Sequence, residues 1–228
     1  MPENRYFVER TLQHGDSVII KNDELHYLKN VMRRRVGDSV ELINGNGMLA
    51  TADVMKLFDK EAHLTVKEAN SVQKEATHLN LLLAFLKPAH LEYAIEKCSE
   101  VGVSAFTLFA ASRSEKKAVS EQYLKRLETI ILSSTRQCGR LFTPTLKIVE
   151  KMEEGLEGEI LFGDLATTTP ITDIALAPVV TLAIGPESGF TEEERQLLLA
   201  KGAKGVRFSK NTLRAETAAV CGSLLLLQ

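Results

Sequence analysis

A nearly uninterrupted apolar run, LNLLLAFL at residues 79–86, indicates the fold class of this sequence. A strand with one solvent-facing side alternates apolar and polar residues, whereas a strand covered on both faces is apolar along most of its length. Shorter runs of the same kind recur at residues 105–110, 159–162 and 179–184. Helical patterns follow the first two runs, at residues 89–101 and 120–138. Buried strands that alternate with helices predict an α/β fold with a mostly parallel sheet.

The N-terminal part of the chain has a different pattern, in which short β-type runs are separated by turn signals. These runs are residues 18–21, 39–43 and 62–66, and a short helix is expected at 23–33. Asn44-Gly45-Asn46-Gly47 is a strong turn signal between two of the strands. The segment therefore predicts a small β-barrel-like module. The polar stretch 70–79 is interpreted as a linker, which places a domain boundary between residues 72 and 73.

The charge balance limits how this chain can meet a nucleic acid. With 28 Lys and Arg against 30 Asp and Glu, the formal net charge is −2, so the overall field is not basic. Trp is absent and aromatic residues make up 6% of the chain, which argues against a wide stacking platform for single strands. Two local basic segments remain: Arg33–Arg35, and residues 111–140, where seven Lys and Arg accompany three Glu. Each is either a phosphate-binding patch or an ordinary solvated surface.

Cysteine usage and hydropathy indicate the compartment. Cys98, Cys138 and Cys221 are odd in number and lack metal-ligand spacing, which favours a reducing compartment and predicts no metal site. Cys98 lies at helical spacing with Leu91 and Ile95, so we expect it to be a small core residue. The sequence has no apolar stretch long enough to span a bilayer, and its first residues, MPENRYFVER, lack an apolar h-region, so no signal peptide is expected. A cytoplasmic protein with no membrane partner is therefore expected.

Residues 182–190, LAIGPESGF, place an apolar strand directly before a glycine-flanked turn. In parallel α/β sheets, ligands bind beyond the carboxyl ends of the strands, and Gly185 and Gly189 would let the backbone approach a ligand closely. Thr191 and Glu194 predict a capping box at the start of the next helix. Consecutive Glu residues at 192–194 disfavour a phosphate there and favour a cationic or neutral polar ligand. The alternative is a plain strand–turn–helix connection.

A second polar loop, SKNTLRAETA at residues 209–218, precedes the last helix. Arg214 and Glu216 cannot both be buried without partners. They form either a helix-capping ion pair at the surface or part of a ligand-binding loop. A dinucleotide-dependent dehydrogenase is disfavoured because no G-x-G-x-x-G follows the first strand of the α/β part.

A series of motifs, in order along nearly the whole chain, resembles the small-subunit ribosomal RNA uridine N3-methyltransferases, a family in the SPOUT class of S-adenosylmethionine-dependent enzymes. The matching segments are Arg5-Tyr6-Phe7; His26-Tyr27-Leu28 with Val31-Met32-Arg33 and Gly37-Asp38; Glu92, Lys97 and Glu100-Val101-Gly102-Val103; Ser112-Arg113-Ser114; Gln137-Cys138-Gly139-Arg140 with Pro144; Gly185-Pro186-Glu187-Ser188-Gly189; and Leu213-Arg214-Ala215-Glu216-Thr217-Ala218. The sequence departs from the family pattern at Ser188, at Ser209-Lys210-Asn211 and at Thr135-Arg136.

The resemblance implies two domains, a homodimer and a reaction. Residues 73–228 would form a SPOUT methyltransferase domain that ends in a deep trefoil knot, and residues 1–72 a PUA-like RNA-binding barrel. The implied reaction is S-adenosylmethionine-dependent methylation of N3 of a uridine in the 16S ribosomal RNA of the small subunit, without a metal. The implied cofactor-binding residues are Phe162, Gly163, Asp164, Ile184, Gly185, Pro186, Glu187, Gly189, Phe208, Ser209, Thr212 and Leu213. The implied RNA-binding residues are Arg5, Arg33, Arg34, Arg35, Lys87 and Arg140.

The chemistry of this reaction suggests the catalytic residues. Uracil N3 carries a proton that must leave as the nitrogen attacks the methyl group, so the site needs a base or a cation that stabilises the anion. Arg113 and Arg214 are the candidates for stabilising the anion or gripping phosphate. Glu187 and Glu216 are the candidates for accepting the proton or orienting the arginines.

Two other functions remain open from the residues alone. One is a knotted RNA-binding or assembly protein without activity, which only the departures at Ser188 and Asn211 favour. The other is a SPOUT methyltransferase that acts on a ribose 2′-hydroxyl or on another RNA base.

Overall fold

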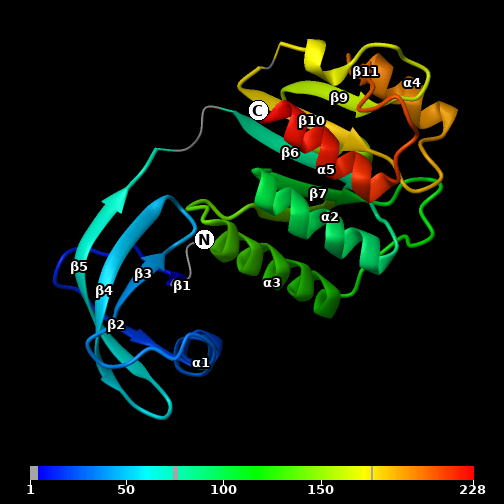
Figure 1. Ribbon diagram of the computed structural model, residues 1–228. Helices are drawn as coiled ribbons and strands as arrows, with labels where there is room; N and C mark the ends of the chain where they lie inside the picture. Colours follow the sequence, from blue (N-terminus) through cyan, green and yellow to red (C-terminus); the bar gives the residue numbers. More distant parts are fainter. Residues whose placement is uncertain (1–4, 74–76, 176) are drawn as a thin grey trace. The chain divides into compact units, whose positions relative to one another are not determined.

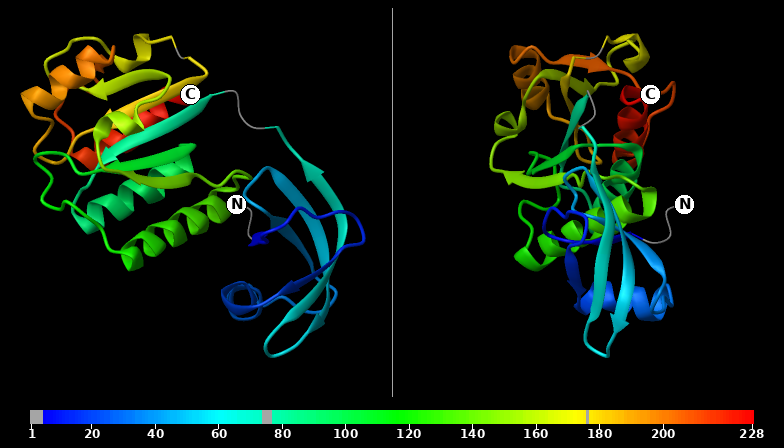
Figure 2. Two further views of the ribbon diagram at one scale, coloured as in Figure 1. Left: turned by 180° about the vertical axis from the view of Figure 1, so that it is seen from behind. Right: turned by 90° about the vertical axis from the view of Figure 1, so that its left-hand side faces the viewer.

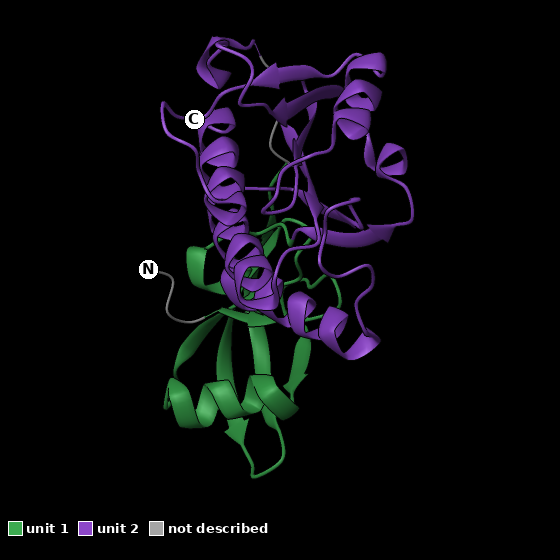
Figure 3. Ribbon diagram, turned by 90° about the vertical axis from the view of Figure 1, so that its right-hand side faces the viewer, with its two compact units in different colours: residues 1–74, 135–143 green, residues 75–134, 144–228 purple. Residues whose placement is uncertain are grey.

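The computed structural model describes residues 5–73, 77–175 and 177–228. The chain divides into two compact units, one formed by residues 1–74 with 135–143 and the other by 75–134 with 144–228 (Figure 3). The polypeptide therefore passes from one unit to the other three times. Each unit has its own sheet and its own hydrophobic core.

The first unit is built on a five-stranded sheet in the order β1-β3-β4-β5-β2. Its strands are β1 (Arg5–Phe7), β2 (Ser17–Ile20), β3 (Ser39–Ile43), β4 (Met48–Leu57) and β5 (Ala62–Ser71). β1 and β3 run parallel, and all other neighbours run antiparallel. Register shifts between β4 and β5 add local twist, and Figure 2 shows a strongly curled sheet. Among the described residues no pairing joins β1 to β2, so the sheet is curled but not closed.

The concave side of this sheet is filled by apolar side chains. Every second residue of β4 from Met48 to Val54 is buried, as a strand with one covered face requires. The helix expected at 23–33 is present as α1 (Asn22–His26), which continues as a π-helical turn, η1 (Tyr27–Val31). Leu25 and Leu28 from these two helical segments complete the core.

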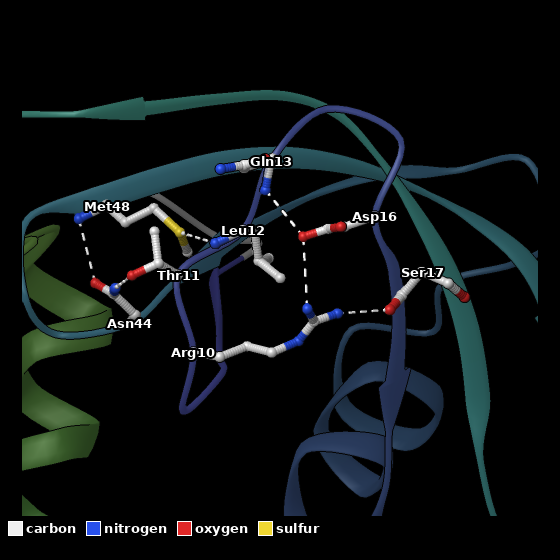
Figure 4. Close-up of polar contacts among 8 residues, drawn as sticks. All are labelled: Arg10, Thr11, Leu12, Gln13, Asp16, Ser17, Asn44 and Met48. Carbon is white, nitrogen blue, oxygen red and sulfur yellow. Dashed lines mark hydrogen bonds and ion pairs between the residues drawn. The ribbon is translucent and has the colours of Figure 1, made fainter.

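The loop between β1 and β2 is fixed by side chains that bond to its own backbone (Figure 4). Asp16 accepts a hydrogen bond from the Gln13 N–H at 3.0 Å and lies 3.5 Å from the guanidinium of Arg10. Arg10 also donates to the carbonyl oxygen of Ser17 at 2.7 Å. In the following β3–β4 turn, Asn44 accepts two backbone N–H groups through its side-chain oxygen.

Residues 135–143 join this unit by pairing with the β3–β4 turn. The Gly47 N–H donates to the carbonyl oxygen of Leu141, and the Thr143 N–H donates to that of Gly45, each at 2.9 Å. Gly47 has a φ of 91°, and a Cβ there would lie 2.5 Å from the ring of Phe142. The Asn-Gly-Asn-Gly segment is thus the predicted turn and also the docking point for a distant part of the chain.

The second unit is an α/β layer built on a six-stranded sheet in the order β11-β9-β10-β6-β7-β8. Its strands are β6 (His78–Ala84), β7 (Ala105–Phe109), β8 (Thr145–Val149), β9 (Glu159–Gly163), β10 (Val179–Ile184) and β11 (Lys204–Val206). The helices are α2 (Pro88–Val101), α3 (Glu121–Cys138), α4 (Glu192–Ala200) and α5 (Ala215–Leu226), with 3-10 turns η2 (Met152–Gly155) and η3 (Ile171–Asp173). Every strand pair is parallel, which confirms the predicted sheet type.

Successive residues of β6 face two different cores. Leu79, Leu81 and Leu83 pack with α2, α3 and α5 on one face of the sheet, where Figure 1 shows these helices together. Leu82 and Ala84 pack on the other face with residues of η2 and α4. Both faces are therefore covered, which explains why residues 79–86 are apolar at every position except Asn80. Cys98, on α2, is fully buried in the first of these cores as predicted.

The C-terminal end of α3 is held in the first unit by charged side chains. Arg136 pairs with Glu24 at 2.5 Å. Arg5 pairs with Glu41 at 2.8 Å and also donates to the carbonyl oxygen of Gly139. Burial raises the pKa of Glu24, and the positive charge of Arg136 opposes that rise.

Most expected helices and strands are confirmed, with ends that differ by one or two residues. β5 is longer than expected and continues to Ser71, and β6 begins at His78. The segment interpreted as a linker is therefore shorter than 70–79, and its residues 74–76 lie outside the described chain. β8 was not predicted because it is an edge strand with a largely exposed pattern and no apolar run. None of the described helices combines the length and apolar character that a membrane span needs.

Candidate functional site: a pocket at the ends of three parallel strands

The pocket lies in the second unit, where β11, β9 and β10 are neighbours and end at the same edge of the sheet. Each strand is followed by a loop, and the three loops with the first turn of α5 enclose about 250 Å³. Its lining residues are Gly163, Asp164, Leu165, Ile184, Gly185, Pro186, Glu187, Ser188, Gly189, Phe190, Val206, Arg207, Phe208, Ser209, Asn211, Thr212, Leu213, Ala215 and Ala218. The implied cofactor residues all lie among these except Phe162, which is buried behind the pocket in the β9 strand.

The loop after β10 is shaped by a tight turn and a helix cap. Gly189 has a φ of 74°, and its N–H donates to the carbonyl oxygen of Pro186 at 2.8 Å. Thr191 and Glu194 form the predicted capping box, in which each side chain accepts the backbone N–H of the other residue. Glu194 also accepts the N–H of Ser112 at 2.7 Å through its second oxygen, so the cap ties the loop to residues that follow β7.

The loop after β9 is held by a buried carboxylate. Asp164 pairs with Arg195 of α4 at 3.0 Å, and its side chain is only 8% exposed. Its other oxygen accepts the N–H of Ala166 at 2.9 Å. Asp164 therefore fixes the loop after β9, which forms one wall of the pocket, through its contacts with Arg195 and Ala166.

The loop after β11 closes on itself through Arg207. The Arg207 guanidinium donates to the carbonyl oxygens of Ser209 at 2.9 Å and Lys210 at 2.7 Å. The Asn211 N–H donates to the hydroxyl oxygen of Ser209 at 3.1 Å. The residues that depart from the family pattern here thus form a locally satisfied loop.

Arg113 and Ser188 connect two loops reciprocally. The Arg113 guanidinium donates to the carbonyl oxygens of Ser188 at 3.2 Å and Phe190 at 3.4 Å. The Ser188 hydroxyl donates to the carbonyl oxygen of Arg113 at 3.3 Å. The departure at Ser188 therefore adds a contact, and Arg113 already contacts the pocket loop through its side chain.

Three titratable side chains meet beside the pocket. Glu187 accepts the Lys87 N–H at 3.0 Å, and the same oxygen lies 3.2 Å from Nδ1 of His90. Glu216 has an oxygen 3.8 Å from that Nδ1. Burial acts to raise the pKa of Glu187, but the backbone hydrogen bond from Lys87 and the contact with His90 outweigh it and hold the pKa below the usual value.

Sequence reasoning missed His90. It lies in the first turn of α2, directly after β6, and β6 is the neighbour of β10 in the sheet. His90 could have been predicted only from the order of the strands, because the loops that follow neighbouring parallel strands such as β6 and β10 lie at the same edge of the sheet.

Arg214 is the N-cap residue of α5, and its side chain is exposed. Within the described part of the chain its guanidinium has no ion-pair or hydrogen-bond partner. The helix-capping ion pair considered for Arg214 and Glu216 is absent from these described residues.

Lys87, an implied RNA-binding residue, is paired with Glu115 at 3.2 Å on an exposed surface.

The other implied RNA-binding residues belong to the first unit. Arg33 and Arg35 are exposed, whereas Arg34 is half-buried. The side chain of Arg5 is only 12% exposed and is occupied by Glu41. Arg140, in the returning segment, is half-buried in that same unit.

The pocket combines glycine-containing turns, apolar side chains and a carboxylate, which suits a small molecule with an apolar part and a polar or cationic part. Across residues 5–73, 77–175 and 177–228, no three His, Cys, Asp or Glu side chains converge as metal ligands.

Comparisons with known proteins identify the family. A family model described as an RNA methyltransferase domain matches residues 73–226, and one described as an RNA methyltransferase PUA domain matches residues 20–67. A ribosomal RNA small subunit methyltransferase E of Synechocystis is 31% identical over 89% of this chain and 70% of its own length. The protein of the same name from Buchnera aphidicola is 26% identical over 95% of this chain and 89% of its own.

A solved structure agrees with these sequence matches. A methyltransferase of Legionella pneumophila, in complex with the bound cofactor S-adenosylmethionine, superimposes with a TM-score of 0.90 at 26% identity, over 99% of this chain and 97% of its own. The chain therefore belongs to the RNA methyltransferase family, in which its relatives are the ribosomal RNA small subunit methyltransferases E.

Proposed function

We propose that this methyltransferase uses S-adenosylmethionine to methylate N3 of a uridine in the 16S ribosomal RNA of the small subunit, in the cytoplasm. The observation that carries the proposal is the pocket formed by three loops at the ends of β9, β10 and β11, in a chain of the RNA methyltransferase family. The motif resemblance supports uridine N3 as the acceptor, and the names of the relatives support the RNA substrate.

The residues of the pocket fit the proposed cofactor. Ile184, Phe208 and Leu213 offer apolar surface for an adenine ring, and the Gly185–Gly189 turn offers backbone polar groups at close range. The carboxylate of Glu187 on the lining suits a positively charged sulfonium. When bound, S-adenosylmethionine supplies an electrophilic methyl group. The Legionella structure, which holds this cofactor, supports the assignment.

Two arginines have different roles in this proposal. Arg113 holds the loop after β10 through the carbonyl oxygens of Ser188 and Phe190, so it positions the pocket wall. Arg214 has an exposed guanidinium next to the pocket residues Leu213 and Ala215, and it stabilises the uracil anion as N3 attacks.

The remaining parts of the proposal concern RNA binding and assembly. Residues 1–72 act as a PUA-like RNA-binding domain, with Arg33 and Arg35 contacting phosphates, and residues 73–228 form the methyltransferase domain with a C-terminal knot. Two chains associate as a homodimer. The PUA match to residues 20–67 and the exposure of the two arginines support the first part, and the motif resemblance supports the knot and the dimer.

The test uses small ribosomal subunits from cells that lack this protein, incubated with the purified protein and methyl-labelled S-adenosylmethionine. Nucleoside mass spectrometry should then find label in N3-methyluridine. Label in a 2′-O-methyl nucleoside or in another base would support a different acceptor. RNA binding without any label, together with no cofactor binding in calorimetry, would support the assembly protein.

A further inference from the structure

The cluster of His90, Glu187 and Glu216 brings together side chains from α2, the loop after β10 and the first turn of α5. Both carboxylates approach the same ring nitrogen of His90, Nδ1, at 3.2 Å and 3.8 Å. His90 belongs to none of the sequence motifs, and its side chain is 34% exposed. The contact with Glu187 places the ring beside a residue that lines the pocket.

The carboxylates decide which ring nitrogen carries the proton. In a neutral imidazole one nitrogen donates and the other accepts, and a carboxylate at Nδ1 takes the N–H at that position. Nε2 then holds the lone pair. In the described part of the chain Nε2 has no hydrogen-bond partner, so its lone pair is available to an incoming donor.

Glu216 provides a second, independent indication. Its side chain is 9% exposed, and its Oε2 is buried without a hydrogen bond in the described chain. A buried carboxylate oxygen that lacks a donor is unfavourable unless a cation forms beside it. Protonation of His90 creates that cation 3.8 Å away, so Glu216 favours the ring after it has accepted a proton.

The charged side chains of α2 and its N-cap that lie nearest His90 in the sequence are paired with other groups. In the first turns of α2, Lys87 pairs with Glu115 at 3.2 Å, and Glu92 pairs with Arg126 of α3 at 2.7 Å. Tyr123 of α3 donates its hydroxyl to the carbonyl oxygen of Pro88. Among the described residues, Glu187 and Glu216 are the charged groups in contact with the ring.

We propose that His90 is the base that removes the N3 proton of the target uridine. The N3–H bond breaks as the Nε2–H bond forms, and the N3 lone pair displaces sulfur from the methyl carbon of the cofactor. The products are N3-methyluridine, neutral S-adenosylhomocysteine and a protonated His90, which returns its proton to water. This inference rests on the proposed function, since it assigns the proton acceptor of that reaction.

Single-turnover rates over a pH series test the role of His90. In the wild type, the rate should rise with pH and then level off, as in a reaction that needs an unprotonated base. His90→Gln should lower the rate by about 100-fold or more, which is the usual contribution of a general base, and the rate should keep rising at alkaline pH as N3 ionises in water. Cofactor affinity measured by calorimetry should stay within about threefold.

The chain offers a matched control in the first unit. His63 and Glu61 form a pair at 2.8 Å with side-chain exposures of 34% and 32%, the same as those of His90 and Glu187. His63→Gln should leave both the rate and the pH profile unchanged. A His90→Gln enzyme that matches the wild type in rate and profile would overturn the inference.

A spectroscopic measurement does not depend on turnover. Nitrogen-15 spectra of the five histidine rings, with His90 identified by the signal missing from His90→Gln, report which nitrogen is protonated. We expect the Nδ1–H form for His90 in the neutral ring, lost or mixed in Glu187→Gln. An Nε2–H form would overturn the inference even if the variants are unstable. If the wild type makes no N3-methyluridine, the proposed function fails as well; if it does, these results bear on His90 alone.

Discussion

The backbone of Gly189 is left-handed, with a φ of 74°, yet a Cβ at this position would meet no atom within 4 Å. The left-handed backbone conformation, and not steric crowding, is therefore the reason for glycine at the end of the pocket turn. A β-branched residue is strained there by about 1–2 kcal/mol, whereas Asn tolerates the left-handed region.

Gly189→Val should consequently distort the turn and weaken S-adenosylmethionine binding by tenfold or more, and Gly189→Asn should retain most of the affinity. Titration calorimetry on both folded variants measures the difference. Equal, wild-type-like affinity in the two would mean that the turn does not hold the cofactor.

The exposed side chain of Arg214 is expected to contribute to the reaction rate and not to the stability of the fold. Its guanidinium has no partner among the described residues, so Arg214→Ala should leave the melting temperature nearly unchanged. The single-turnover rate should fall by roughly 100-fold, as for loss of one preorganised donor. Arg214→Lys should recover only part of the rate, because the planar fork is lost. A lowered melting temperature with a normal rate per folded molecule would assign Arg214 to helix capping.

At the scale of helices and strands, the pattern of apolar residues was sufficient for every buried strand of the second unit. β8 escaped because an exposed edge strand has no apolar run. The glycine turn and the Arg214 loop were found because turn chemistry is local. His90 was not, because its meeting with Glu187 and Glu216 depends on which strands are neighbours, and the sequence does not state strand order.

The contact between the end of α3 and α1 gives a prediction about stability and pH. Arg136→Ala would leave the largely buried Glu24 without its cation, at a cost of about 1–3 kcal/mol in the free energy of unfolding near pH 7. The pKa of Glu24 is already raised above the ordinary 4.5, and loss of Arg136 should raise it further. A raised carboxyl pKa means that stability is lost as the pH rises through it.

The difference between Arg136→Ala and the wild type should accordingly shrink as the pH falls through the raised pKa of Glu24 in the two folded proteins, and should be smallest near pH 4.5 and below, where Glu24 is largely neutral in the folded state of both. Urea unfolding at a series of pH values measures this difference in the free energy of unfolding. In a Glu24→Gln background, the effect of Arg136→Ala should no longer vary with pH in this range. A difference that grows on acidification would contradict this account of the pair.

At the scale of the whole molecule, a net charge of −2 leaves RNA binding to local patches. Arg33 and Arg35 are exposed and Arg34 is half-buried, so the basic triplet offers two solvent-exposed cations rather than three. Replacing Arg33 and Arg35 with Ala should reduce the slope of log affinity against log salt by about one to two, with cofactor affinity unchanged.

A charge-matched control is Lys151→Ala with Lys201→Ala, two exposed lysines of the second unit. This pair should leave the salt slope near the wild-type value. Filter binding to the ribosomal RNA at several salt concentrations compares the two double variants. Equal salt slopes in the two double variants would mean that Arg33–Arg35 is an ordinary solvated surface.

The return of residues 135–143 to the first unit has a consequence for synthesis on the ribosome. All five strands of the N-terminal sheet lie before residue 72, but the β3–β4 turn still lacks its partners when residue 72 emerges, because those of Gly45 and Gly47 are Thr143 and Leu141. At roughly 5–20 residues per second, the turn waits about 4–14 s for the next 71 residues. β6 waits longer still, since its neighbour β10 ends only at Ile184. Until then the buried strand β6 has an open edge on the side where β10 will pair, and this edge is an apolar surface for a nascent-chain chaperone.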